Sequence, residues 1–216
     1  MGQYASTILP RIATVNRKAT SPRAWQRMLS GRRLDLLDPS PLDVEIEDIA
    51  RGLARVPRWN GQTEGAHSFS VAQHTLVVDA IAGMATPGLD ARGRLAVMLH
   101  DAPEYVIGDL ISPFKVLLGG EYKAIEARLL AAIHRRFGLA TPLPARLSTA
   151  IKAADRVAAY YEATRLAGFS EVEARKFFGS PKGVDAARLD LKPWPASVAE
   201  KRFRARFAVL FAAASA

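Results

Sequence analysis

Apolar residues recur at helical spacing along most of the chain, and this pattern predicts a largely helical protein. The helices expected from the spacing cover residues 47–56, 71–85, 91–102, 121–137, 145–167 and 196–211. Ser70 and Asp90 precede two of them as N-caps, and Pro57 ends the first. Residues 71–85 and 91–102 are apolar around most of the helix surface, which is typical of buried helices.

The segments between these helices carry turn-forming and polar residues, and strand signals are nearly absent. We expect residues 24–29 to form a helical turn that buries Trp25 and Met28. Residues 34–46 should form an extended link, and residues 60–69 and 108–120 should form loops. The prediction is an all-α, single-domain helical bundle over residues 34–216, preceded by an arm of residues 1–33.

The composition limits the classes of protein to which the chain can belong. Of its 216 residues, 49% are hydrophobic and 24% are charged, so extensive disorder is excluded. The absence of cysteine excludes disulfides, zinc fingers, iron–sulfur clusters and cysteine nucleophiles. It also fits a reducing compartment, so we expect a cytoplasmic protein. No apolar run reaches the roughly 18 residues that a membrane span needs, so no membrane partner is expected.

The net charge of +9 is concentrated at the N-terminus. Residues 1–33 hold seven basic residues and no acidic one, whereas the remainder carries a net charge of only +2. We expect a solvated, partly ordered basic arm, with attraction to polyanions or an organelle transit peptide as alternatives. Nucleic acid is an unlikely partner, because aromatic and basic residues do not alternate along the arm.

Four polar residues interrupt helices that should be buried: His74, the adjacent pair His100 and Asp101, and Asp155. An ionised carboxylate in apolar surroundings is costly unless it is paired or binds a metal. Two imidazoles and two carboxylates form a ligand set suited to one divalent transition metal ion, such as Mn, Co, Zn, Fe or Ni. The alternative is that each residue is satisfied separately, with Asp155 paired to a basic neighbour on its own helix.

The sequence around these residues resembles the HD-domain metal-dependent phosphohydrolases, in particular the branch that contains the bacterial 5′-deoxynucleotidases. The resemblance rests on SVAQHTL around His74, LHDAPE at 99–104, GDLISPFK at 108–115, IKAADRVAAY at 151–160 and an Arg-Trp pair at 58–59. It covers roughly residues 34–170. It implies a helical bundle of the HD-domain type that hydrolyses a phosphate ester, with the four His and Asp residues as metal ligands.

The resemblance also implies roles for five further residues. Glu104 would orient or deprotonate the attacking water, and Asp109 would lie near the metal and the sugar. Arg58 would face the phosphate, since its planar guanidinium suits two oxygens, and Lys115 is a second candidate for that task. Trp59 would lie beside the sugar and exclude a 2′-hydroxyl, although a packing role at a helix end is the alternative.

Two remaining histidines receive different interpretations. His67 departs from the closest deoxynucleotidases and is expected either to contact the substrate or to complete its loop. His134 lies among arginines on residues 121–137 and is expected at the surface. Neither residue is expected to bind the metal.

The function expected from the resemblance is a 5′-nucleotidase that releases phosphate from deoxyribonucleoside 5′-monophosphates. The alternative is a triphosphohydrolase or pyrophosphohydrolase of (deoxy)nucleoside triphosphates. The partner in either case is a small nucleotide. The apolar stripe of Phe203, Phe207 and Phe211 would either cover the core or form the seam of a homodimer.

Overall fold

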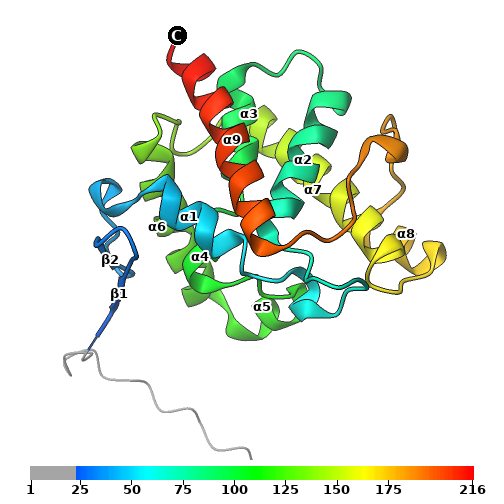
Figure 1. Cartoon of the computed structure of the whole chain (residues 1–216), viewed down its shortest axis with the longest axis horizontal. Coiled ribbons are helices and arrows are strands. Elements are labelled where there is room, and N and C mark those ends of the chain that lie inside the picture. The colour runs from blue at the N-terminus through cyan, green and yellow to red at the C-terminus, as the bar shows by residue number, and fades with distance from the viewer. Residues whose placement is uncertain (1–22) are drawn as a thin grey trace, which may run out of the picture.

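The computed structural model describes residues 23–216 and shows a mostly helical protein (Figure 1). The α-helices of this part are α1 (Ile46–Leu53), α2 (Val71–Ala85), α3 (Ala91–Met98), α4 (Glu104–Ile107), α5 (Ser112–Leu118), α6 (Gly120–Arg136), α7 (Ala145–Arg165), α8 (Glu171–Phe178) and α9 (Ala196–Ser215). Two short strands, β1 (Trp25–Arg27) and β2 (Arg33–Asp35), pair in an antiparallel manner. Short 3-10 helices cover Pro41–Asp43, Arg58–Gly61 and Ala186–Arg188. The expectation of a largely helical fold is confirmed.

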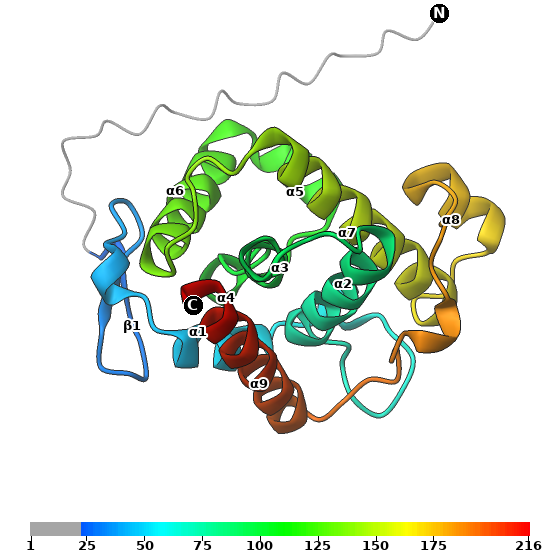
Figure 2. The same ribbon diagram turned by 90° about the horizontal axis from the view of Figure 1, so that it is seen from above.

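Helix α2 packs against α3, α7 and α9 (Figures 1 and 2). The core that these helices enclose is apolar, and its largest fully buried side chains include Phe69, Ile81, Leu95, Met98 and Phe203. Helix α9 turns Phe203 and Phe207 into this core. Two residues of the apolar stripe therefore cover the core, whereas Phe211 is 38% exposed, and the homodimer seam stays a prediction.

Local capping chemistry fixes where the central helices begin. The Ser70 hydroxyl accepts a hydrogen bond from Gln73 N at 3.3 Å, and the Asp90 carboxylate accepts one from Gly93 N at 2.7 Å. Both predicted N-caps are therefore confirmed. Helix α3 ends at Met98, four residues before its predicted end at residue 102, and a series of turns leads to α4. After Met98 the backbone N–H groups of His100 and Ala102 donate to carbonyls three positions earlier, so the chain forms turns instead of an α-helix. Pro103, which has no N–H, prevents α3 from resuming through it.

Residues 24–29 do not form the expected helical turn. They include β1, which pairs with β2, and this places Trp25 on the small sheet instead of in the core. The guanidinium groups that stack on the Trp25 ring lie 4.7, 5.5 and 4.5 Å from its centroid and belong to Arg23, Arg27 and Arg33. Aromatic and basic side chains on a short hairpin thus stabilise each other without a core to bury them.

Two other expectations about the connecting segments are wrong. The predicted loop at 108–120 contains α5, which begins with a proline in its first turn, a position where proline favours a helix. The link at 34–46 is not extended throughout, because Pro41–Asp43 forms a 3-10 helix. Helix α8 was not among the expected helices either, although a complete capping box of Ser170 and Glu173 begins it.

His134 is buried in the structure, with 3% of its surface exposed, and the expectation of a surface histidine is wrong. The chain folds back over the end of α6, and Leu139 N donates to the carbonyl oxygen of His134 at 2.8 Å. Burial lowers the pKa of His134 to about 4. The sequence analysis missed this burial because Arg135 and Arg136 directly follow His134, and a run of basic residues indicates a solvated face.

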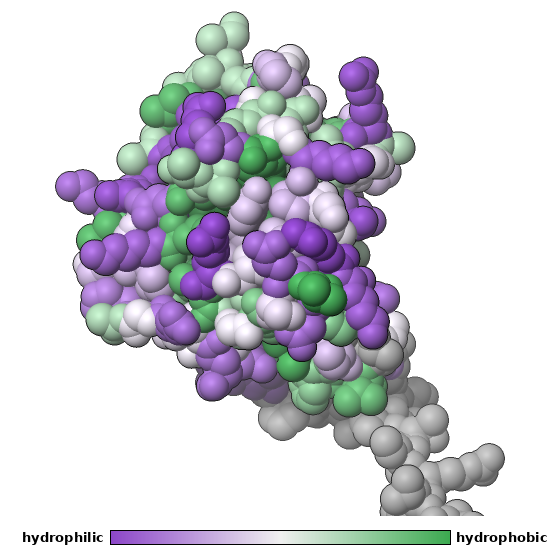
Figure 3. All heavy atoms as spheres, turned by 90° about the vertical axis from the view of Figure 1, so that its right-hand side faces the viewer, coloured by the Kyte–Doolittle hydropathy of each residue, from purple (hydrophilic) through white to green (hydrophobic). Residues whose placement is uncertain are grey.

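The hairpin and α8 lie at opposite ends of the protein (Figures 1 and 2). Figure 3 shows the end that carries α8, where hydrophilic and hydrophobic residues are interspersed. Within residues 23–216, no helix combines the length and the apolar character that crossing a membrane requires.

Candidate metal centre

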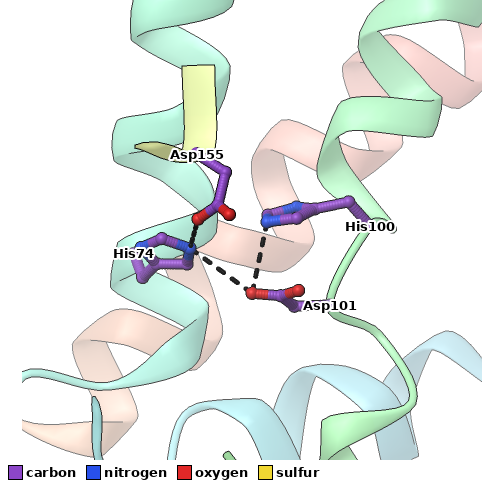
Figure 4. Close-up of side chains that lie close together, drawn as sticks. All are labelled: His74, His100, Asp101 and Asp155. Atoms are coloured by element: carbon purple, nitrogen blue, oxygen red, sulfur yellow. Dashed lines mark ion pairs between the residues drawn. The ribbon is translucent and has the colours of Figure 1, made fainter. Parts of the chain in front are cut away.

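The four predicted ligands come together from three parts of the fold, as Figure 4 shows. His74 lies in the first turn of α2, His100 and Asp101 lie in the turn after α3, and Asp155 lies midway along α7. Each offers a nitrogen or a carboxylate oxygen, and these atoms all lie within 4.8 Å of one another. The packing of α2 against both α3 and α7 creates this convergence, and the cluster could hold a metal ion.

The Nε2 atoms of the two imidazoles face the two carboxylates. His74 Nε2 lies 3.2 Å from Asp155 Oδ1 and 3.4 Å from Asp101 Oδ2, and His100 Nε2 lies 3.2 Å from the same Asp101 oxygen. Both Nε2 atoms are buried, yet neither has the geometry of a hydrogen bond to any described residue. Buried polar atoms are normally satisfied, so this pair marks the centre as a position for a ligand.

The other nitrogen of each ring is held by an acceptor. His74 Nδ1 lies 2.5 Å from Glu162 Oε1, and His100 Nδ1 lies 2.8 Å from the carbonyl oxygen of Val97. Because a carboxylate and a carbonyl can only accept, each Nδ1 carries the hydrogen and leaves Nε2 for a proton or a metal. This is the usual arrangement of metal-binding histidines, so the four residues fit a divalent ion.

The electrostatics of the cluster favour positive charge at its centre. Burial opposes ionisation of Asp101, but His100 and His74 outweigh it and hold the pKa of that carboxyl well below its usual range. Burial and Arg58 favour the neutral form of His74, but Glu162 and the ligand carboxylates outweigh them and raise its pKa well above 6.5. The carboxylates are therefore ionised at neutral pH and attract a cation.

One side of the centre is open to solvent. His74 is fully buried, whereas 23% of the Asp101 side chain and 42% of the Asp155 side chain are exposed. Asp155 forms no ion pair with Lys152 or Arg156 among the described residues, so the alternative of separate pairing on α7 is not what the structure shows. The two aspartates are therefore the most exposed members of the cluster.

Glu104 begins α4 directly beside the cluster and is almost fully buried. Its Oε1 lies 3.5 Å from Lys115 Nζ, whereas its Oε2 has no hydrogen-bond partner among the described residues. Burial, together with Asp101 and Asp109, raises the pKa of Glu104 to about 9. The structure therefore places Glu104 and Lys115 together at the edge of the centre.

Arg58 is bound by carboxylates on two of its nitrogens. Nη1 donates to Asp109 Oδ2 at 3.0 Å, and Nε donates to Glu162 Oε2 at 3.3 Å. Trp59 Nε1 donates to the same Glu162 oxygen at 2.9 Å. Arg58 was expected to bind two phosphate oxygens with its guanidinium. Asp109 and Glu162 already bind Nη1 and Nε, so Nη2 is the nitrogen that these carboxylates leave free.

The Trp59 ring packs against aromatic residues near α8. Its centroid lies 5.6 Å from that of Phe169 and 5.8 Å from that of Phe178. Both packing and the indole hydrogen bond fix the ring, so Trp59 is a packing anchor whatever else it contacts. The backbone of Trp59 and Asn60 is left-handed, with φ of 56° and 52°, which is unfavourable for the bulky Trp59 but tolerated by asparagine.

His67 is exposed on the loop after the 3-10 helix. Within residues 23–216 its side chain forms no hydrogen bond or ion pair with the cluster. The structure brings the other predicted site residues into one connected group and leaves His67 outside that group.

Glu162 is the residue of this group that the sequence analysis missed. It is fully buried and contacts His74, Arg58 and Trp59. Burial opposes its ionisation, but His74 and Arg58 outweigh it and lower its pKa to about 2. Its position was a usable signal, because Glu162 follows Asp155 by seven residues, or two helical turns, and so shares its face of α7.

These features describe a mostly helical protein with a His/Asp cluster that could bind a metal. The chain is 55% identical over 188 residues to an uncharacterized protein of Rhodobacter capsulatus, a match that covers 87% of this chain and 96% of that protein. The chain belongs to the family that includes this relative. No family model matches the chain. Because the relative is uncharacterized, the function is argued from the site.

Proposed function

We propose that the chain is a metal-dependent phosphohydrolase of the HD-domain type, acting as a 5′-nucleotidase on deoxyribonucleoside 5′-monophosphates. The observation that carries the proposal is the convergence of His74, His100, Asp101 and Asp155 on a single point, where neither imidazole Nε2 has a hydrogen-bond partner within residues 23–216. The order of these residues along the chain is that of the HD-type ligand set. The identification of the substrate rests on the sequence resemblance.

The four clustered residues would hold one divalent transition metal ion through two nitrogens and two oxygens. Such an ion, when bound, polarises a phosphoryl oxygen and lowers the pKa of a coordinated water. Mn, Co, Zn, Fe and Ni all accept this ligand set, so the supply in the cell decides among them. The exposed sides of Asp101 and Asp155 give a substrate access to the centre.

Glu104 and Lys115 serve different reactants, the attacking water and the phosphate. Glu104 Oε2 is free to hold a water by a hydrogen bond, while Oε1 is engaged by Lys115. Lys115 carries positive charge toward the phosphate and keeps 27% of its side chain exposed. A water held on one side of the phosphate and a cation near its oxygens are the elements that an in-line displacement requires.

Arg58 contributes a fixed positive charge. Asp109 and Glu162 hold its guanidinium in place, and Nη2 is left to donate to a phosphate oxygen. In this arrangement Asp109 positions Arg58, and Trp59 forms a rigid wall beside the sugar. A charge that is already in place costs little reorganisation when the substrate binds.

The test is product analysis with a panel of deoxynucleoside monophosphates, ribonucleoside monophosphates and deoxynucleoside triphosphates, using protein loaded with Mn²⁺ or Co²⁺. Phosphorus NMR identifies the released species. The proposal predicts inorganic phosphate from the deoxynucleoside monophosphates and little from their ribose counterparts. Release of triphosphate or pyrophosphate from the triphosphates would replace it with a triphosphohydrolase or pyrophosphohydrolase. Absence of turnover on the whole panel would remove the substrate assignment.

A further inference from the structure

Glu162 occupies a position that joins the metal cluster to the loop that carries Arg58. Its carboxylate is fully buried, and the two oxygens face different parts of the site. Oε1 faces His74 Nδ1 at 2.5 Å, and Oε2 accepts from Trp59 Nε1 at 2.9 Å and Arg58 Nε at 3.3 Å. All three groups donate hydrogen bonds to the carboxylate, and the Arg58 guanidinium also balances its negative charge.

The contact at Oε1 fixes the orientation of a metal ligand. His74 is fully buried on α2, and the hydrogen bond at Nδ1 holds the tautomer that directs the lone pair of Nε2 to the centre. Loss of such an outer contact typically weakens metal binding by about 10–100-fold. His100 has its own contact at Val97 O, so Glu162 acts on one of the two imidazoles.

The contacts at Oε2 fix the loop of Arg58–Gly61. Trp59 holds a left-handed backbone conformation, which costs free energy for a bulky residue and persists only where tertiary contacts impose it. The indole hydrogen bond to Glu162 is one of those contacts, and the guanidinium bond is another. The Glu162 carboxylate thus positions both His74, a proposed metal ligand, and Arg58, the cation proposed to face the phosphate.

We propose that Glu162 is the positioning residue that couples the metal centre to phosphate binding, by orienting His74 with one oxygen and holding Arg58 and Trp59 with the other. The proposal rests on the proposed function, since it takes His74 as a metal ligand and Arg58 as a phosphate contact. Helix α7 then supplies a ligand, Asp155, and two turns later the group that orients a second ligand.

The variant Glu162→Gln tests the coupling, because an amide keeps the shape but can accept at one end only. Whichever way the amide turns, it presents its NH₂ group either to the His74 ring or to the donors of Arg58 and Trp59. We expect a binding constant for Mn²⁺, measured by calorimetry, that is about 10–100-fold weaker than in the wild type. We also expect a raised KM for the nucleotide at saturating metal, and partial rescue of both values by Glu162→Asp.

The matched control is Glu171→Gln, which removes the same charge from an exposed residue of α8 whose side chain is 66% exposed. It should leave the metal affinity and KM within about twofold, as expected for an exposed ion pair. A folded Glu162→Gln protein that binds Mn²⁺ and substrate as the wild type does would overturn the proposal. If the wild type itself binds no metal, the proposed function fails instead, and the two failures are distinguishable.

A measurement on the wild type covers the case in which Glu162→Gln does not fold. Long-range ¹H–¹⁵N NMR spectra report which ring nitrogen of each histidine carries hydrogen. In the Zn²⁺-loaded protein we expect His74 to carry it on Nδ1, the nitrogen that faces Glu162 Oε1. An Nε2–H tautomer of His74 would contradict the proposal without any variant.

Discussion

Replacement of Asp155 by asparagine should weaken metal binding strongly while changing the stability of the metal-free protein only slightly. Asp155 contacts His74 at 3.2 Å, but 42% of its side chain is exposed. Ion pairs with this exposure contribute about 1 kcal/mol or less. In a chain of 216 residues such a loss lowers the melting temperature by only about 2–4 °C. The metal-free Asp155→Asn variant should therefore melt close to the metal-free wild type.

The metal should act very differently on the two proteins. At a concentration 100 times its dissociation constant, a bound ion stabilises the wild type by about 2.7 kcal/mol. That corresponds to a rise in melting temperature of about 5–11 °C. Loss of a residue that only hydrogen-bonds to a metal ligand weakens metal affinity by about 10–100-fold. Loss of a direct ligand such as Asp155 should weaken it by at least about 100-fold. The same metal concentration then stabilises the variant by about 0.4 kcal/mol, which is about 1 °C.

The assay is differential scanning fluorimetry of metal-stripped protein over a series of Mn²⁺ or Co²⁺ concentrations. Asp38→Asn is the matched control, because it removes an aspartate charge from an exposed position outside the cluster. The control should keep the full rise in melting temperature. The reasoning is refuted if Asp155→Asn shows the same metal-induced rise as the wild type, or if metal-free Asp155→Asn is already destabilised by several kcal/mol.

Three further outcomes follow from the rest of the fold. Replacement of the fully buried Phe203 by alanine should lower the free energy of unfolding by about 3–5 kcal/mol in urea titrations, and a loss below 1 kcal/mol would contradict its place in the core. Asp79→Ala should cost about 3 kcal/mol by the same measurement, because Asp79 neutralises two half-buried guanidinium groups at 2.5 and 2.8 Å; a near-neutral effect would contradict this. Because burial lowers the pKa of His134 to about 4, its neutral form stabilises the fold fully above pH 6.5, and about 3 kcal/mol is lost as the pH falls toward 4. Urea titrations at several pH values should show this loss in the wild type and lack it in His134→Leu; identical pH profiles would disprove the assignment.

Six of the helices and the four clustered residues could be predicted because their signals are local. Ser70 and Asp90 cap their helices through hydrogen bonds to residues three positions later. His74, His100, Asp101 and Asp155 stand out because each interrupts an apolar stretch. These four residues could therefore be grouped from the sequence alone. In the structure, one nitrogen or oxygen atom from each lies within 4.8 Å of the others.

The roles that the sequence analysis missed depend on contacts between distant segments. Glu162 matters because α7 packs against α2 and brings its carboxylate to His74, which lies 88 residues earlier in the sequence. Arg58 matched a pattern, but its engagement by Asp109 across 51 residues is not visible in the sequence. His134 was misplaced for a different reason, since its arginine neighbours indicated a solvated face while its own side chain is buried.

The measurement that tests the central claim most directly is phosphate release by metal-stripped protein after addition of Mn²⁺, Co²⁺, Zn²⁺, Mg²⁺ or no metal. The substrate is a deoxyribonucleoside 5′-monophosphate, and Asp101→Ala is run in parallel. We expect no release without metal, restored release with at least one transition metal, and none in the variant under any condition. Release that is independent of metal, or that persists in Asp101→Ala, would contradict the assignment of the His/Asp cluster as a metal-dependent catalytic centre.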